Sequence, residues 1–514
     1  MSSQSRTGGR SATSAEFTHV VHEVARGSRT SIIYGLLGHV VRIALQVLMG
    51  RVLGAHAYGL YTLGRSVLEV ATRLGSMGMQ NAVVRFLAIF RGEGDEAQIR
   101  GTILASLALV LVASSALGVG LWLVAEWLAV TVFHEPALGP VLRVFAVALP
   151  LHAMLVLLAA CARGFRHMAY FSGMTHMLHP LGVLLLSSIA FLIGLRLEGA
   201  LLGFTCATGL AALLMLYGLV RLFPTLWALR QGVTFNGKDV VPYAAKMFLA
   251  DFTHPLLGHT DRLMLGYFSI ARDVGIYSIS AFIGSKLSFF QIMFNSIFAP
   301  VIADLHNRGK HDELVRLFQM VSKWTLLCTL PIFFACLFLG DFVLSLFGRD
   351  FQEGWPVLVI LASAHLIDIG VGPVGYMLLM TGRPGLALLN SWLSGVVNIL
   401  LNLWLIPRHG MLGAALATGI TLALLNIVRL IQVRYLYHCY PFRLSTLKTL
   451  IAGAIAGGAV WKLSQMNQLE DWGKLAMMGG GLLLYAGLLT LFGWDDEDQL
   501  VIHRLRRNVL PFRP

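Results

Sequence analysis

The stretch TILASLALVLVASSALGVGLWL, residues 102–123, contains 22 residues and no charged side chain. As an α-helix it would be about 33 Å long, which is enough to cross the hydrocarbon core of a bilayer. Apolar runs of this length recur to the end of the chain. A membrane β-strand would be about ten residues long and would alternate in polarity, and these runs do neither. The sequence therefore predicts an all-α polytopic membrane protein.

The composition of the whole chain agrees with this prediction. Of the 514 residues, 56% are hydrophobic and only 13% are charged, yet the formal net charge is +13. A soluble domain carries about 25% charged residues, so the composition excludes a soluble enzyme and a disordered protein. The basic residues are scattered between apolar runs rather than gathered on one solvated face, which excludes a nucleic-acid partner. The five dispersed cysteines form no CxxC pair, so no metal site and no cofactor are expected.

The apolar runs predict fourteen transmembrane helices. Their predicted spans are 31–53, 57–79, 102–123, 142–160, 171–193, 200–222, 243–268, 276–302, 318–339, 355–380, 386–406, 412–433, 447–463 and 475–494. With the N-terminus on the inner side, 24 of the 39 lysines and arginines fall on that side, 8 on the outer side and 7 within helices. Because positive charge is retained on the cytoplasmic side, we predict that both termini are cytoplasmic and that the protein lies in the inner cell membrane.

An internal repeat divides the chain into two halves. Two sets of residues recur, at offsets of 216 and 210: Gly50, Gly59 and Tyr61 as Gly266, Gly275 and Tyr277, and Leu202, Gly203 and Ala207 as Leu412, Gly413 and Ala417. A repeat of six helices keeps its orientation in the membrane, which is typical of transporters with a substrate site between parallel repeats. The predicted parts are a polar tail (1–30), an N-lobe (31–223), an inter-lobe loop (224–240), a C-lobe (241–434), two extra helices (445–494) and a tail (495–514).

Five stretches of the chain, taken in order, resemble one family of transporters. They are GRVLGAHAYGLY from Gly50, DRLMLGYFSIARDVGIYSISAFI from Asp261, FNSIFAPVIADL from Phe294, LFGRDFQEGWPVLVILA from Leu346 and LNLWLIPRHGMLGAALATGI from Leu401. They are similar to the multidrug/oligosaccharidyl-lipid/polysaccharide exporter superfamily, and more closely to its polysaccharide transporter branch. The resemblance implies two six-helix lobes around a central cavity, alternating access, and a lipid-linked oligosaccharide as cargo.

The resemblance also implies partners for the protein, and other functions compete with the flippase function. A flippase of this kind is not an enzyme, and it would work in the lipid bilayer beside polysaccharide polymerase and assembly proteins. Two alternatives come from the same superfamily, a flippase for a peptidoglycan lipid precursor and a cation-coupled drug exporter. A membrane glycosyltransferase, polymerase or ligase is the alternative from another class, but such an enzyme needs a sizeable outer loop or a catalytic loop that bears carboxylates.

Charged side chains within the predicted helices are candidates for the site, because a charge inside the bilayer is costly. Arg65, Glu69 and Arg73 are spaced by four residues and fall on one face of their helix. Arginine and lysine bind phosphate oxygens. We therefore predict a cationic cavity for a pyrophosphate that is formed by Arg42, Arg65, Arg73 and Lys286, with Glu69, Asp251 and Asp368 tuning the cations or carrying a coupling ion, either H⁺ or Na⁺. The alternative is that these charges pair only with each other.

The loop GVTFNGKD, residues 232–239, is close to the phosphate-binding pattern GxxxxGK[ST]. Its last position is aspartate, so the hydroxyl that would bind magnesium is missing, and no strand is predicted before it. We interpret it as a cytoplasmic loop, and no nucleotide-driven engine is predicted.

Overall fold

The computed structural model describes residues 8–165, 167–227, 232–251, 253–441, 444–466 and 471–492, and every regular element within these ranges is a helix. Nine helical segments in the described ranges are long and apolar enough to cross a membrane. The prediction of an all-helical, multi-pass membrane protein is therefore confirmed. The predicted number of fourteen spans stays a prediction, as do the domain boundaries.

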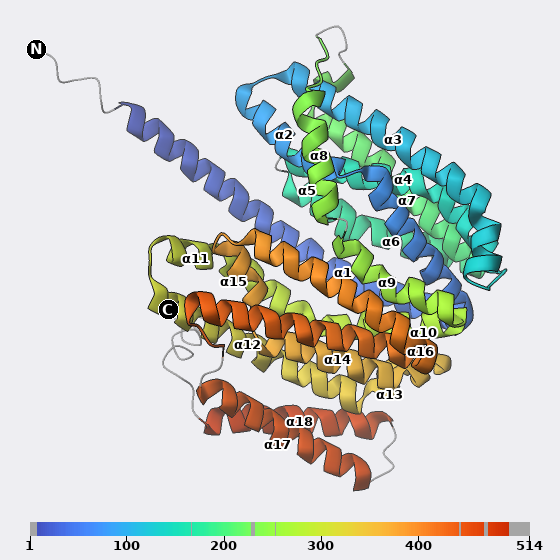
Figure 1. The fold of residues 1–514 in the computed structure, drawn as a ribbon, viewed down its shortest axis with the longest axis vertical. Coiled ribbons are helices and arrows are strands. Elements are labelled where there is room, and N and C mark those ends of the chain that lie inside the picture. Colours follow the sequence, from blue (N-terminus) through green and yellow to red (C-terminus); the bar gives the residue numbers. More distant parts are fainter. Residues whose placement is uncertain are drawn as a thin grey trace, which may run out of the picture. The chain divides into compact units, whose positions relative to one another are not determined.

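The chain divides into two compact units, Met1–Gly275 and Ile276–Pro514, which are described separately. The helices of the first unit (Figure 1) are α1 (Gly8–Ser76), α2 (Met79–Glu93), α3 (Glu96–Trp127), η1 (Leu128–Val132), α4 (Leu138–Gly164), α5 (Met168–Ser172), η2 (Gly173–Leu178), α6 (His179–Leu192), α7 (Leu197–Leu222), η3 (Pro224–Trp227), α8 (Gly237–Asp251) and α9 (Thr253–Phe268). Helix α10 (Ala271–Gly284) begins in this unit and continues into the next.

The second unit continues from α10. Its remaining helices are η5 (Ser285–Ser288), α11 (Phe289–Asn307), α12 (His311–Phe338), α13 (Gly340–Ser345), η6 (Arg349–Gly354), α14 (Trp355–Gly370), α15 (Val374–Met380), α16 (Pro384–Tyr437), α17 (Leu444–Met466) and α18 (Asp471–Leu491). Several predicted spans are interrupted, since the span 276–302 contains the 3₁₀ segment η5 and the span 355–380 is broken between α14 and α15.

Glycines with a positive φ explain why two long helices each contain two predicted spans. Gly54 in α1 has a φ of 72°, and Gly410 in α16 has a φ of 54°. A side chain is strained in this left-handed region, whereas glycine adopts it without a steric penalty. Each glycine therefore marks the turn at which one spanning helix ends and the next begins.

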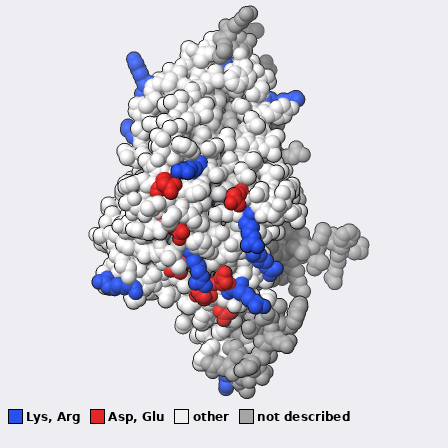
Figure 2. Space-filling view, turned by 90° about the vertical axis from the view of Figure 1, so that its right-hand side faces the viewer, with Lys and Arg blue, Asp and Glu red and all other residues white. Residues whose placement is uncertain are grey.

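The core of the first unit is formed where α4 packs against α3 and α7 (Figure 1). Small residues bring neighbouring helices close together in this unit, as in other membrane proteins. On α7, a Cβ atom added to Gly203 would lie 2.2 Å from Oγ of Ser187 on α6. Large hydrophobic side chains are exposed on the first unit, among them Leu192 at 88% and Leu213 at 66%. Figure 2 shows one face of the molecule, on which residues without a charge predominate. This is the surface expected of a protein that faces lipid.

A buried arginine fixes the loop that follows η3. Arg100 on α3 is 1% exposed, and its Nη1 atom donates a hydrogen bond of 2.6 Å to the carbonyl oxygen of Gly232. The loop also touches the backbone of α3, because a Cβ atom added to Gly101 would lie 1.9 Å from the carbonyl oxygen of Thr234. The stretch that resembled a phosphate loop is thus held against the first unit by its backbone.

Replacing Arg100 by leucine is expected to destabilise the first unit. The change leaves the Gly232 carbonyl oxygen without its charged donor, and such a loss costs about 1–3 kcal/mol. The unfolding temperature of the detergent-purified protein measures the effect. Arg308→Ala is the matched control, because Arg308 is exposed and pairs with the exposed Asp304. An unfolding temperature that falls equally in both variants would contradict the anchoring role of Arg100.

Candidate functional site

The candidate site of the first unit lies along the second half of α1, the part of the helix that comes after the turn at Gly54. Arg65, Glu69 and Arg73 lie there at helical spacing, and none of the three is fully exposed. Residues four apart on a helix are neighbours on one face. The structure therefore places three of the predicted site residues in one polar stripe, which is named here the α1 stripe.

Arg65 is the best-contacted cation of the α1 stripe. Its Nη2 atom lies 3.8 Å from Oε1 of Glu69, and the two side chains are 35% and 22% exposed. The guanidinium carbon of Arg65 also lies 5.3 Å from the ring centre of Phe204 on α7, within the range of a cation–π contact. Arg65 is thus held by a carboxylate and by an aromatic ring while part of its surface stays open to a ligand.

A histidine on α4 shares the carboxylate of Glu69. Nε2 of His152 lies 4.0 Å from Oε1 of Glu69, and Nδ1 of the same ring lies 3.2 Å from the hydroxyl of Thr72. His152 and Arg65 are both in contact with the ring of Phe204. Glu69 is therefore the centre of a small, partly buried cluster rather than a free carboxylate.

Arg42, in the first half of α1, has a different partner. Its Nη2 atom lies 2.9 Å from Nδ1 of His176 in the π-helical segment η2. Arginine can only donate, so Nδ1 of His176 is the acceptor and carries no proton in this contact. A neutral partner leaves the positive charge of Arg42 uncompensated.

Two further histidines line the same region and have hydroxyl partners. Nδ1 of His259 on α9 lies 3.3 Å from the hydroxyl of Ser66, and Nε2 of His179 lies 3.1 Å from the hydroxyl of Thr208. Each ring therefore takes part in a hydrogen bond with a neutral group. No group of three metal-binding side chains occurs among the residues that the structure describes.

The charges of this region do not balance. Among the four candidate site residues on α1, Arg42, Arg65 and Arg73 are positively charged and Glu69 is negatively charged. Groups of one sign in a low-dielectric region create a strong field for a ligand of opposite sign. The region is suited to bind an anion with oxygen atoms, such as a phosphate group.

Lys286, the fourth predicted cation, belongs to the second unit. It lies in η5, the 3₁₀ segment that interrupts the helical run from α10 to α11. Its Nζ atom lies 4.0 Å from the ring centre of Phe282, in cation–π contact. A short 3₁₀ segment within a spanning helix often marks a functional position.

The two remaining predicted carboxylates lie in different surroundings. Oδ1 of Asp368 on α14 accepts a 2.7 Å hydrogen bond from Nδ2 of Asn426 on α16. Asp251 ends α8, and its side chain lies outside the described residues. The structure thus brings Arg65 and Glu69 into direct contact, places Arg42 and Arg73 on the same helix, and describes Lys286 and Asp368 within the second unit.

Sequence reasoning missed the residues that complete the cluster. His152 lies inside the apolar run 142–160, where a lone titratable residue is itself a signal that could have been used. Phe204 carried no such signal, because one more aromatic residue in an apolar helix looks like ordinary packing. Its role depends on helix α7 lying beside α1 and α4, which only the folded structure reveals.

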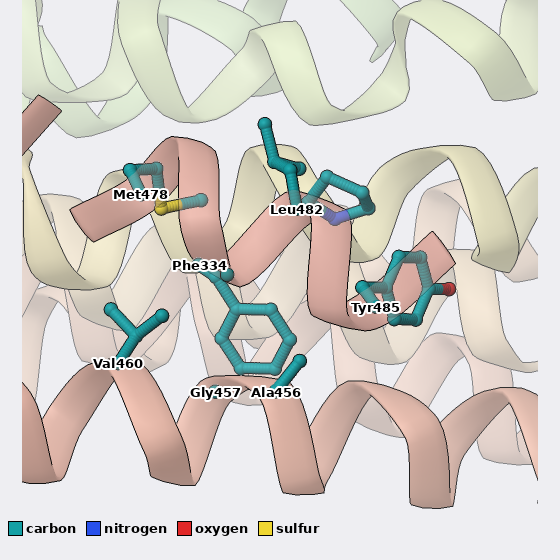
Figure 3. Close-up of a pocket in the computed structure, with 9 residues that line it drawn as sticks. Phe334, Ala456, Gly457, Val460, Met478, Leu482 and Tyr485 are labelled. Carbon is teal, nitrogen blue, oxygen red and sulfur yellow. The ribbon is translucent and has the colours of Figure 1, made fainter. Parts of the chain in front are cut away.

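The second unit also contains a small apolar pocket where α17 and α18 meet α12. Figure 3 shows the side chains that line it, and they include Phe334 from α12, Val460 from α17 and Met478 from α18. The side chains that line the pocket could pack against a hydrocarbon ligand, and they present almost no polar atoms to it.

Comparison with known proteins identifies relatives by sequence. The sequence profile of the family described as polysaccharide biosynthesis protein matches residues 24–306. A probable low-salt glycan biosynthesis flippase of Haloferax volcanii is 23% identical over 38% of this chain and 41% of its own length. The teichuronic acid biosynthesis protein TuaB of Bacillus subtilis is 24% identical over 49% of this chain and 54% of its own length. The chain thus spans about half the length of these curated relatives, or less.

Two solved structures share the fold. A lipid II flippase, MurJ, in an inward closed conformation superposes with a TM-score of 0.69 over 91% of this chain and 98% of the other, at 15% identity. An inward-facing multidrug resistance transporter of the MATE family, in the MOP superfamily, superposes with a TM-score of 0.62 over 79% and 98%, at 13% identity. These likenesses show that the chain shares its fold with both structures.

Proposed function

Because the chain belongs to the polysaccharide biosynthesis protein family, we propose that it is a flippase for a polyprenyl-pyrophosphate-linked oligosaccharide. It would carry this precursor of a surface polysaccharide from the inner to the outer leaflet by alternating access. The observation that supports the proposal is the set of candidate cations on α1, Arg42, Arg65 and Arg73, of which Arg65 pairs with Glu69. A chain with this activity makes and breaks no covalent bond, so it is a transporter rather than an enzyme.

The arrangement of the arginines suits a pyrophosphate. Planar guanidinium groups donate two hydrogen bonds to phosphate oxygens, and these charge-assisted bonds are stronger than neutral ones. Arg65 keeps 35% of its side chain exposed while Glu69 and Phe204 hold it. In the proposed cycle Arg42, Arg65, Arg73 and Lys286 contact the pyrophosphate, and Glu69 competes with it for Arg65, which helps to release the cargo.

The cargo is anionic, and its charge supplies a driving force for export. An anion that moves outward from a negative interior gains about 2.3 kcal/mol per charge per 100 mV. A proton or sodium ion carried by Glu69, Asp251 or Asp368 is a second energy source under this proposal. Orientation follows the distribution of basic residues, with both termini on the cytoplasmic side of the inner membrane.

The lipid tail of the cargo needs a path away from the charged region around the arginines of α1. The apolar pocket where α17 and α18 meet α12 supports a path along these two helices for the polyprenyl tail (Figure 3). Its lining residues offer the tail contacts that resemble those of lipid. The charged head group and the hydrocarbon tail would then cross the membrane in different surroundings.

A deletion strain tests the proposed class of activity. Loss of the gene should cause lipid-linked oligosaccharide units to accumulate on the inner leaflet while the composition of each unit stays normal. Accumulation of incomplete units would instead favour a glycosyltransferase. Rescue of a strain depleted of its peptidoglycan-precursor flippase, without any effect on surface polysaccharide, would favour the peptidoglycan alternative.

A further inference from the structure

Two glycines of the first unit bring helix backbones into direct contact. A Cβ atom added to Gly59 on α1 would lie 1.7 Å from the carbonyl oxygen of Ala271, at the start of α10. A Cβ atom added to Gly275 would lie 2.1 Å from the carbonyl oxygen of Ala55. Real side chains do not approach a backbone so closely, so both positions require glycine. These four residues are named here the glycine contact.

The glycine contact is reciprocal, and its reciprocity matches the internal repeat. The offset of 216 that relates Gly59 to Gly275 also relates Ala55 to Ala271. Ala55 and Ala271 each lie four residues before their glycine. Gly59 therefore packs against the repeat equivalent of Ala55, and Gly275 packs against the repeat equivalent of Ala271. Such an exchange of equivalent partners is what a local two-fold axis through a contact produces. It is also a pair of small-xxx-small motifs, which let membrane helices approach closely.

The glycine contact is dry and lies at one end of the α1 stripe. Ala55 and Ala271 are 1% and 2% exposed. Tyr61 and Tyr277, which follow Gly59 and Gly275 by two residues in the chain, are also related by the repeat and are buried. Thr62 is the first half-buried polar residue beyond Gly59, and Arg65 follows it one turn later.

We propose that the glycine contact is the seal that closes the outer end of the transport path, and that it opens when the cargo leaves. This inference rests on the proposed function and on the proposed orientation, in which the turn at Gly54 faces outward. A seal made of backbone and small side chains has no interlocking side chains that must unpack. It can therefore separate as one surface, with a modest difference in free energy between the closed and the open states.

The seal is tested by the reactivity of a cysteine placed just inside it. Thr62→Cys is introduced into a chain whose five native cysteines have been replaced, and intact cells are treated with a membrane-impermeant maleimide. With the glycine contact intact, Cys at position 62 should be protected. Gly59→Ala or Gly275→Ala should raise its labelling rate about tenfold, because a minor open state of about 1% would become about 10% populated.

Controls separate the seal from general damage. Gly120→Ala changes a glycine of α3 that has open space around it, so it should leave the labelling unchanged. Arg143→Cys, at an exposed position of the first unit, gives the rate for an unprotected site. Unchanged labelling in both glycine variants would overturn the proposal.

One outcome does not depend on the glycine variants being folded. If Thr62→Cys in the otherwise glycine-intact chain reacts as fast as Arg143→Cys, the contact does not seal the path and the proposal fails. Labelling does not require knowledge of the cargo, so a failed seal can be told apart from a failed flippase assignment, which is read from accumulated lipid-linked units.

Discussion

Cells that carry Arg65→Ala or Arg42→Ala are expected to lose surface polysaccharide while the protein still inserts into the membrane. Each change removes a guanidinium group that the account assigns to the pyrophosphate. A hydrogen-bonded charge contributes about 1.5–3 kcal/mol, which corresponds to a loss of transport of about 10- to 100-fold. Arg42 and Arg65 are assigned to the same pyrophosphate, so the loss in the double variant should be smaller than the product of the two single losses.

The control for this prediction is the loss of an arginine that is not assigned to the pyrophosphate. Arg143 is exposed and pairs with Glu126 at 3.1 Å, so Arg143→Ala should leave transport near the native level. Arg65→Lys should give an intermediate rate, because lysine keeps the charge but loses the planar pair of donors. Normal surface polysaccharide in cells with both Arg42→Ala and Arg65→Ala would overturn the site assignment.

Glu69→Ala is expected to lower both the stability of the protein and its transport rate. Transport should fall because Glu69 no longer competes with the pyrophosphate for Arg65 and so no longer helps to release the cargo. The same change removes the carboxylate that faces Arg65 and His152. Breaking a buried ion pair from one side leaves an uncompensated charge, and for a partly exposed pair the cost is about 2 kcal/mol. The unfolding temperature of the purified protein should fall accordingly.

The double variant distinguishes a structural role from a functional one. Arg65→Ala with Glu69→Ala removes both charges, so most of the lost stability should return, because no orphaned charge remains. Transport should stay low, because the phosphate ligand Arg65 is still absent. If transport returned together with stability, the two residues would be a structural pair only, and the pyrophosphate site would lie elsewhere.

The residues of α1 show how far the sequence alone could reach. The apolar runs follow from local chemistry, and the predicted ends of the first two spans, at 53 and 57, fall on either side of the turn that the structure places at Gly54. The spacing of Arg65, Glu69 and Arg73 also predicted their common face. Charge alone could not say that Arg42 would meet His176, because that contact depends on the π-helical segment η2.

Other features depend on packing that no local pattern encodes. Helix α2 (Met79–Glu93) lies between the predicted spans 57–79 and 102–123, and its buried face is apparent only once α3, α4 and α8 surround it. The breaks between α10 and α11 and between α14 and α15 interrupt apolar runs that looked continuous. Gly59 and Gly275 stood out as a repeat, but their mutual contact required the folded chain.

The most direct test of the central claim uses the purified protein in lipid vesicles. A polyprenyl-pyrophosphate-linked oligosaccharide is placed in the inner leaflet, and its appearance in the outer leaflet is followed by cleavage with an added glycosidase that cannot enter. We expect vesicles with the native chain to expose the oligosaccharide at a rate that Arg65→Ala lowers about 10- to 100-fold. Equal rates in native, Arg65→Ala and protein-free vesicles would contradict it.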